Sequence, residues 1–85
     1  MDIDYANLRK VTAREIISAL IHEGFYLRPG RKGRGSHQRF YHEDGRRVTV
    51  TFHKPSQTFA PKTMKSMITQ AGWTEDDLRR LSLLH

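Results

Sequence analysis

Apolar residues recur at helical spacing in two separate parts of this chain. The first stripe falls at positions i, i+3, i+4 and i+7 and consists of Ala13, Ile16, Ile17 and Leu20. This spacing puts its members on one face of a helix. Thr12 and Glu15 have the spacing of a capping box, and Gly24 suits the left-handed position that ends a helix. We therefore predict a helix over residues 13–23.

The second stripe has the same spacing and consists of Met64, Met67, Ile68 and Ala71. Pro61 suits the first turn of this helix, where its missing N–H costs nothing. Gly72 marks the end. Thr74 and Asp77 resemble a further capping box, so we expect a short C-terminal helix over residues 74–85.

The segment between the two stripes predicts three antiparallel strands. They are expected at about residues 25–28, 36–42 and 46–53. A three-residue loop ending at Gly45 would pair His42 with Arg46. This register gathers four apolar side chains on one face, namely Phe40, Val48, Val50 and Phe52. A two-residue turn would put Phe40 on the opposite face, so we favour the three-residue loop.

The same register decides which side chains point away from the helices. Because side chains alternate along a strand, this face is expected to carry His37, Arg39, Tyr41, Thr49, Thr51 and His53. His37 lies opposite Thr51 across the strand pair. Cationic, aromatic and hydroxyl side chains on one open face indicate a binding surface rather than a core.

The order of elements predicts an α+β fold of two layers. The order is helix, three antiparallel strands, helix and a short helix, with both main helices on one face of the sheet. The 85 residues make a single domain with a thin core. Residues 1–10 show no clear period and are expected to form a loosely packed N-terminal extension.

Composition narrows the possible functions. The chain has no cysteine, which excludes disulfides, thiolate nucleophiles and cysteine-type zinc sites. The start at residues 1–4 is acidic and lacks the apolar segment of a secretory signal. The longest apolar run, residues 16–21, is far shorter than the roughly 20 residues that span a bilayer. We expect a cytoplasmic protein with no membrane association and no cofactor.

The charge distribution indicates a polyanionic partner. The net charge is +6 and the pI is about 10.2. Five cations and no acid lie between residues 28 and 39, namely Arg28, Arg31, Lys32, Arg34 and Arg39. Clustered cations gain affinity for phosphates by releasing counterions. A solvated loop is the usual interpretation of a lone charge run, but beside a histidine-bearing strand this run favours nucleic acid.

Three segments of the chain occur together in an order that one protein family shares. They are Gly35-Ser36-His37 followed by Phe40, then Val48-Thr49-Val50, then Lys62 to Gly72. Together they resemble the HicA family, the small toxins of HicA/HicB toxin-antitoxin pairs, over about residues 12–74. The resemblance implies a fold like that of double-stranded RNA-binding domains. The HicA-like core would be residues 12–73, followed by the C-terminal helix.

The resemblance also implies endoribonuclease cleavage of mRNA, with His37 as the catalytic residue, and a HicB-type antitoxin that covers the active face. The chemistry agrees with the residues, because RNA carries its own nucleophile, the 2′-hydroxyl, which needs a base and nearby positive charge. Histidine, whose unperturbed pKa is about 6.5, can act as that base without a metal. The candidate RNA-binding residues are Ser36, Arg39, Arg28, Arg31, Lys32, Arg34, Tyr41, Lys62 and Lys65.

The same residues allow other interpretations. The first is a noncatalytic RNA-binding module of the same fold, in which His37 only binds a phosphate or a 2′-hydroxyl. The second is a metal site built from His37, His42 and His53, which we disfavour because His37 and His42 point to opposite faces. Ser36 could be a nucleophile, but no nearby carboxylate orients a serine–histidine pair, so we expect it to donate to phosphate.

Overall fold

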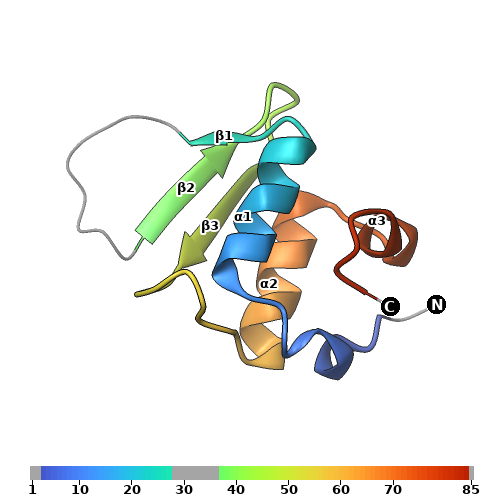
Figure 1. Ribbon diagram of the computed structural model, residues 1–85. Coiled ribbons are helices and arrows are strands. Elements are labelled where there is room, and N and C mark those ends of the chain that lie inside the picture. The colour runs from blue at the N-terminus through green and yellow to red at the C-terminus, as the bar shows by residue number, and fades with distance from the viewer. Residues whose placement is uncertain (1–2, 28–36, 85) are drawn as a thin grey trace.

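Helices cover one face of a three-stranded antiparallel sheet in the computed structural model of the protein (Figure 1). The structure describes residues 3–27 and 37–84. In chain order the elements are the 3-10 helix η1 (Tyr5–Leu8), α1 (Ala13–His22), β1 (Tyr26–Leu27), β2 (His37–Tyr41), β3 (Arg47–Thr51), α2 (Pro61–Ala71) and α3 (Glu75–Arg80). The predicted α+β fold is confirmed, and the order is consistent with a fold like that of double-stranded RNA-binding domains.

Helix α1 is capped at both ends by residues close to it in the sequence. At its start the Glu15 carboxylate accepts from the Thr12 N–H at 2.8 Å, which completes the predicted capping box. At its end Gly24 takes a φ of +95°. The Phe25 N–H then donates to the Leu20 carbonyl at 2.9 Å, as in a Schellman motif. These local signals explain why the sequence located the helix to within one residue.

The hairpin of β2 and β3 has the predicted register. His37 pairs with Thr51 along the strands. At the turn the His42 N–H donates to the Arg46 carbonyl at 3.0 Å, and Gly45 has a φ of +98°. The sheet order is β1-β2-β3. Among the described residues all three strands cover less of the chain than predicted, and the described part of β1 is Tyr26–Leu27.

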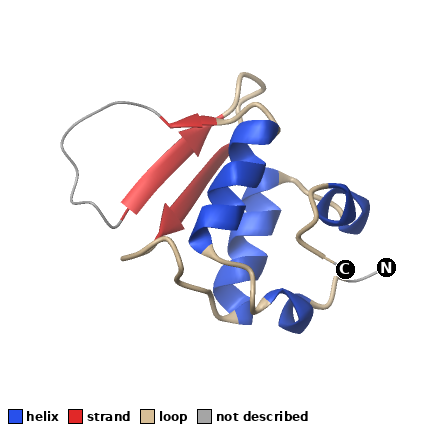
Figure 2. Cartoon of the chain, viewed as in Figure 1, coloured by secondary structure: helices blue, strands red, loops and turns tan. Residues whose placement is uncertain are grey.

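The core lies between the helices and the inner face of the sheet (Figure 2). Its largest fully buried side chains are Phe40, Leu8, Ile16, Leu20, Met64, Ile68, Leu78, Val48 and Val50. Phe52 lies just beyond β3 and is only partly buried. Three of the four side chains that determined the predicted register are therefore buried together.

Two terminal segments differ from the predictions. The described part of the N-terminal extension does not pack loosely, because Leu8 at the end of η1 is only 1% exposed and belongs to the core. The C-terminal helix ends at Arg80 rather than continuing toward the end of the chain. Ser82 has a φ of 64°, and this left-handed residue turns Leu83 back to a buried position. In both segments the path of the chain is determined by the burial of apolar residues in the core.

Candidate active site on the outer face of the sheet

The face of the sheet away from the helices carries a compact set of polar and aromatic side chains. We call it the outer face, and it consists of Tyr26, His37, Arg39, Tyr41, Arg47, Thr49 and Thr51. The backbone pairing arranges these residues in cross-strand rows. Tyr26, Tyr41 and Arg47 form the row nearest the turn, and His37 and Thr51 form the row at the other end of the hairpin.

His37 is the residue of the outer face with acid–base chemistry. Its side chain is exposed, and its Nδ1 lies 3.1 Å from the Thr51 hydroxyl. A hydroxyl can donate or accept, so this contact holds the ring in either neutral tautomer and in the protonated form. Within the part of the chain that the structure describes, no residue bonds to Nε2. This nitrogen can therefore meet a substrate while Nδ1 is held.

Arg39 and Arg47 supply positive charge beside the histidine. Both side chains are exposed. None of the ion pairs among the described residues involves either guanidinium. The outer face contains no acidic residue. Its cations are therefore available to an anion from solution.

Apart from His37, Arg39 and Tyr41, none of the predicted site residues is seen on the described part of the outer face. Arg28, Arg31, Lys32, Arg34 and Ser36 lie outside the described residues. Lys62 and Lys65 are exposed on α2, in the helical layer on the far side of the sheet. Of the predicted site residues that the structure describes, His37, Arg39 and Tyr41 lie together on the outer face.

His42 has a different environment from that of His37. Its Nε2 lies 3.1 Å from the Glu23 carbonyl, and its Nδ1 accepts from the Asp44 N–H at 3.2 Å. The ring packs edge-on against Phe25 with centroids 4.9 Å apart. A Cβ at Gly24 would lie 3.1 Å from Nε2, so this site needs glycine for space as well as for its φ. His42 therefore joins the hairpin to the end of α1.

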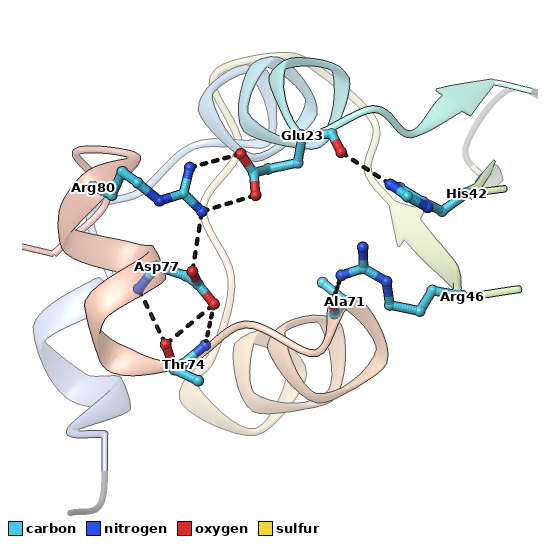
Figure 3. Close-up of polar contacts among 7 residues, drawn as sticks. All are labelled: Glu23, His42, Arg46, Ala71, Thr74, Asp77 and Arg80. Atoms are coloured by element: carbon cyan, nitrogen blue, oxygen red, sulfur yellow. Dashed lines mark hydrogen bonds and ion pairs between the residues drawn. The ribbon is translucent and has the colours of Figure 1, made fainter. Parts of the chain in front are cut away.

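Arg46 fastens the same turn to α2. Its Nη1 donates to the Ala71 carbonyl, and its Nε donates to the Asp44 carboxylate at 2.8 Å. The guanidinium also lies 4.9 Å from the centroid of the Phe25 ring. We call Glu23, His42, Asp44, Arg46 and Ala71 the hairpin clasp. Figure 3 shows its members other than Asp44.

Charged residues at the end of α1 and on α3 pair with each other. Arg80 donates two hydrogen bonds of 2.8 Å to the Glu23 carboxylate and a third, of 3.0 Å, to Asp77. These contacts appear beside the clasp in Figure 3. The bonds from Arg80 hold the pKa of Glu23 below its ordinary value of 4.5. The hydrogen bond from the Thr74 backbone N–H is the main cause that lowers the pKa of Asp77, and the hydrogen bond from Arg80 lowers it further.

No cluster of three potential metal ligands occurs within residues 3–27 and 37–84. His42 points into the clasp, and His53 lies beyond the end of β3. The alternative metal site built from these residues and His37 therefore has no geometric support. Among the described residues, no helix is both long and apolar enough to cross a membrane.

Sequence reasoning overlooked three contributions to the outer face. Alternation from Thr49 and Thr51 would have placed Arg47 there. Thr51 was expected opposite His37 but was not assigned the hydrogen bond to its ring. Tyr26 could not be placed, because the segment between β1 and β2 carries no turn signal that determines which residue of β2 it pairs with.

The fold and the outer face define a small α+β protein with an exposed histidine and two exposed arginines on one face of its sheet. A family model described as HicA toxin of bacterial toxin-antitoxin matches residues 13–73. Because the match covers well over half of the chain, the protein belongs to the HicA toxin family. Membership of a toxin-antitoxin family implies an antitoxin partner. Comparison with curated proteins gives no match.

Proposed function

We propose that this HicA-family chain is an endoribonuclease that cleaves mRNA through His37. The observation that carries the proposal is the exposed ring of His37, held at Nδ1 by Thr51 at 3.1 Å and without a described residue bonded to Nε2. The surrounding face is cationic and has no acid. This combination suits a phosphodiester substrate, because base and positive charge lie side by side.

The reaction uses the 2′-hydroxyl of RNA as the nucleophile. His37 Nε2 takes the proton of the 2′-hydroxyl while the 2′-oxygen bonds to phosphorus. The bond from phosphorus to the 5′-oxygen breaks, and this oxygen takes a proton from a second group or from solvent. The products are a 2′,3′-cyclic phosphate and a 5′-hydroxyl. DNA is not a substrate, because it lacks the 2′-hydroxyl.

The two arginines of the outer face stabilise the charge that develops on the phosphate. A guanidinium keeps its charge at all relevant pH values and matches phosphate oxygens with a planar set of donors. Arg39 lies two residues from His37 on β2 and so shares its face. The cations of residues 28–34 and Ser36 are proposed to extend this binding surface, and Lys62 and Lys65 to contact RNA beyond it.

The proposed inhibitor is a HicB-type antitoxin that covers the outer face in the cytoplasm. An acidic surface on the antitoxin would neutralise Arg39 and Arg47 and block access of RNA to His37. Changing both arginines to glutamine should weaken antitoxin binding and make it less sensitive to salt. Unchanged affinity in a pull-down titration would place the antitoxin elsewhere on the chain.

The test is cleavage of an RNA oligonucleotide by the purified chain in the presence of a chelator, with DNA of the same sequence as a control. Wild type should cut only RNA and leave 2′,3′-cyclic phosphate ends, as measured by mass spectrometry. His37→Ala should lose about 100- to 10,000-fold in rate, the range typical for a general base. His22→Ala changes an exposed histidine in the helical layer and should cut normally.

Other results would contradict the proposal in distinct ways. Binding of RNA without cleavage would make the chain a noncatalytic RNA-binding module. Cleavage that stops with the chelator and leaves 3′-hydroxyl ends would indicate metal-dependent hydrolysis. Full activity of a folded His37→Ala protein, checked by circular dichroism, would remove His37 from the mechanism.

A further inference from the structure

Two tyrosines lie side by side on the outer face at the end nearest the turn. Tyr26 of β1 pairs with Tyr41 of β2, and the ring centroids are 6.3 Å apart with the planes inclined by 31°. Tyr26 is 51% exposed. Exposing the apolar surface of a large aromatic ring to water is unfavourable in free energy. Tyr26 is not part of the hydrophobic core, so packing of the core does not explain its position.

The residues next to the tyrosines are cationic. Arg47 lies directly across from Tyr41, and Arg39 precedes Tyr41 by two residues on the same face. Aromatic rings beside guanidinium groups are the combination that single-stranded nucleic acids bind. The rings stack on the bases while the cations meet the backbone.

We propose that Tyr26 and Tyr41 form a stacking platform for an unpaired RNA base, an inference that rests on the proposed ribonuclease function. The substrate is therefore single-stranded at this point. In a duplex both faces of each base are covered by its neighbours, whereas an unpaired base can lie flat against an aromatic ring. The fold resembles that of double-stranded RNA-binding domains, but the platform favours single strands.

The platform lies at a distance from the reacting phosphate. Tyr41 and His37 are four residues apart on β2, which corresponds to roughly 13 Å along a strand. This distance is too long for the base of the reacting nucleotide itself to reach the platform. The stacked base therefore belongs to a neighbouring nucleotide, and the tyrosines influence which phosphate is presented to His37.

The test measures binding of a fluorescent RNA oligonucleotide by anisotropy, using the full chain with His37→Ala so that the RNA stays intact. Tyr26→Leu keeps an apolar side chain but removes the ring, and it should weaken binding of the single strand by about 5- to 100-fold. Tyr26→Phe keeps the ring and should bind like the parent. Leu27→Thr is the matched control, because Leu27 is the other residue of β1 and faces the opposite side.

A fully paired duplex of the same sequence separates the possible outcomes. The proposal expects the duplex to bind more weakly than the single strand and to be insensitive to Tyr26→Leu. Equal binding of the single strand by Tyr26→Leu and its parent would overturn the platform while leaving the ribonuclease proposal intact. Equal weakening by Leu27→Thr would show that the effect comes from disruption of β1. Absence of RNA binding by the parent would overturn both proposals.

Discussion

His37 and His42 lie on the same hairpin but have opposite surroundings. His37 is exposed on the outer face with one ring nitrogen held by Thr51, and no described residue meets the other. His42 is part of the hairpin clasp, where both ring nitrogens have protein partners and the ring packs on Phe25. An odd separation along the hairpin sends the two side chains to opposite sides.

The same contrast holds for the charges around the two histidines. Arg46 in the clasp is used by Asp44, Ala71 and the Phe25 ring, whereas Arg47, the next residue, is open on the outer face. Groups with satisfied partners stabilise the fold, and groups without them are available for a ligand. This comparison predicts that clasp variants change stability and that outer-face variants change activity.

His42→Ala should have the largest effect on stability. It removes the hydrogen bond to the Glu23 carbonyl and leaves a gap beside Phe25, with an expected loss of about 2 to 3 kcal/mol in the free energy of unfolding. Urea denaturation followed by circular dichroism measures it. A loss as small as that of the exposed control His22→Ala would show that the clasp contributes little.

Arg46→Met and Arg47→Met form a matched pair of neighbours. Arg46→Met loses the bond to the Ala71 carbonyl and the contact with Phe25, so it should cost about 1 to 2 kcal/mol of unfolding free energy. Arg47→Met should leave stability within about 0.5 kcal/mol of wild type but weaken RNA binding. Equal stability of the two variants in the same urea titration would contradict the claim that Arg46 in the clasp stabilises the fold more than Arg47 on the outer face.

Thr51→Val tests whether the hydrogen bond to His37 on the outer face contributes to catalysis. The variant keeps the β-branched shape but loses the hydroxyl that holds His37 Nδ1, and one such hydrogen bond corresponds to about a 2- to 10-fold effect. We expect this loss in kcat, with little change in KM or stability. Thr51→Ser restores the hydroxyl and should recover the rate, and a failure to recover would mean that the bond does not position His37.

Arg80→Met should have the smallest effect, a slight loss of stability near neutral pH that disappears as the pH falls. Arg80 lowers the pKa of Glu23 and Asp77 in the folded state. A carboxylate whose pKa is lower in the folded state than in the unfolded chain stabilises the fold at pH values above its unfolded-state pKa. This stabilisation is lost as the pH falls through the folded-state pKa. Wild type should therefore lose stability on acidification below about pH 4.5. The free energy of unfolding of Arg80→Met should decrease less over the same pH range. Arg79→Met, which breaks only the surface pair with Glu75, is the control for this urea titration.

The parts of the fold that the sequence predicted are those specified by neighbouring residues. The Thr12 capping box and the left-handed Gly24 determine the ends of α1 within one turn each. The register of β2 and β3 follows from a short turn and from the need to bury Phe40 with Val48. Each of these signals lies within a few residues of the structure that it specifies.

The parts that the sequence did not predict depend on distant contacts. Glu23 and Arg80 are separated by 57 positions, and nothing near either residue indicates the other. Tyr26 and Tyr41 pair across an intervening stretch of fourteen residues whose sequence does not specify the pairing. For the candidate site, alternation placed His37, Arg39 and Tyr41 together, but the hydrogen bond from Thr51 required the three-dimensional arrangement of both side chains.

The assignment of chemistry to the outer face is tested by RNA cleavage with His37→Ala and His42→Ala, each with its unfolding free energy determined under the same conditions. We expect His37→Ala to keep wild-type stability and lose cleavage by at least about 100-fold. We expect His42→Ala to lose stability and, at a temperature where it is folded, to cleave near the wild-type rate. Cleavage retained by His37→Ala, or abolished in folded His42→Ala, would contradict the assignment of chemistry to the outer face.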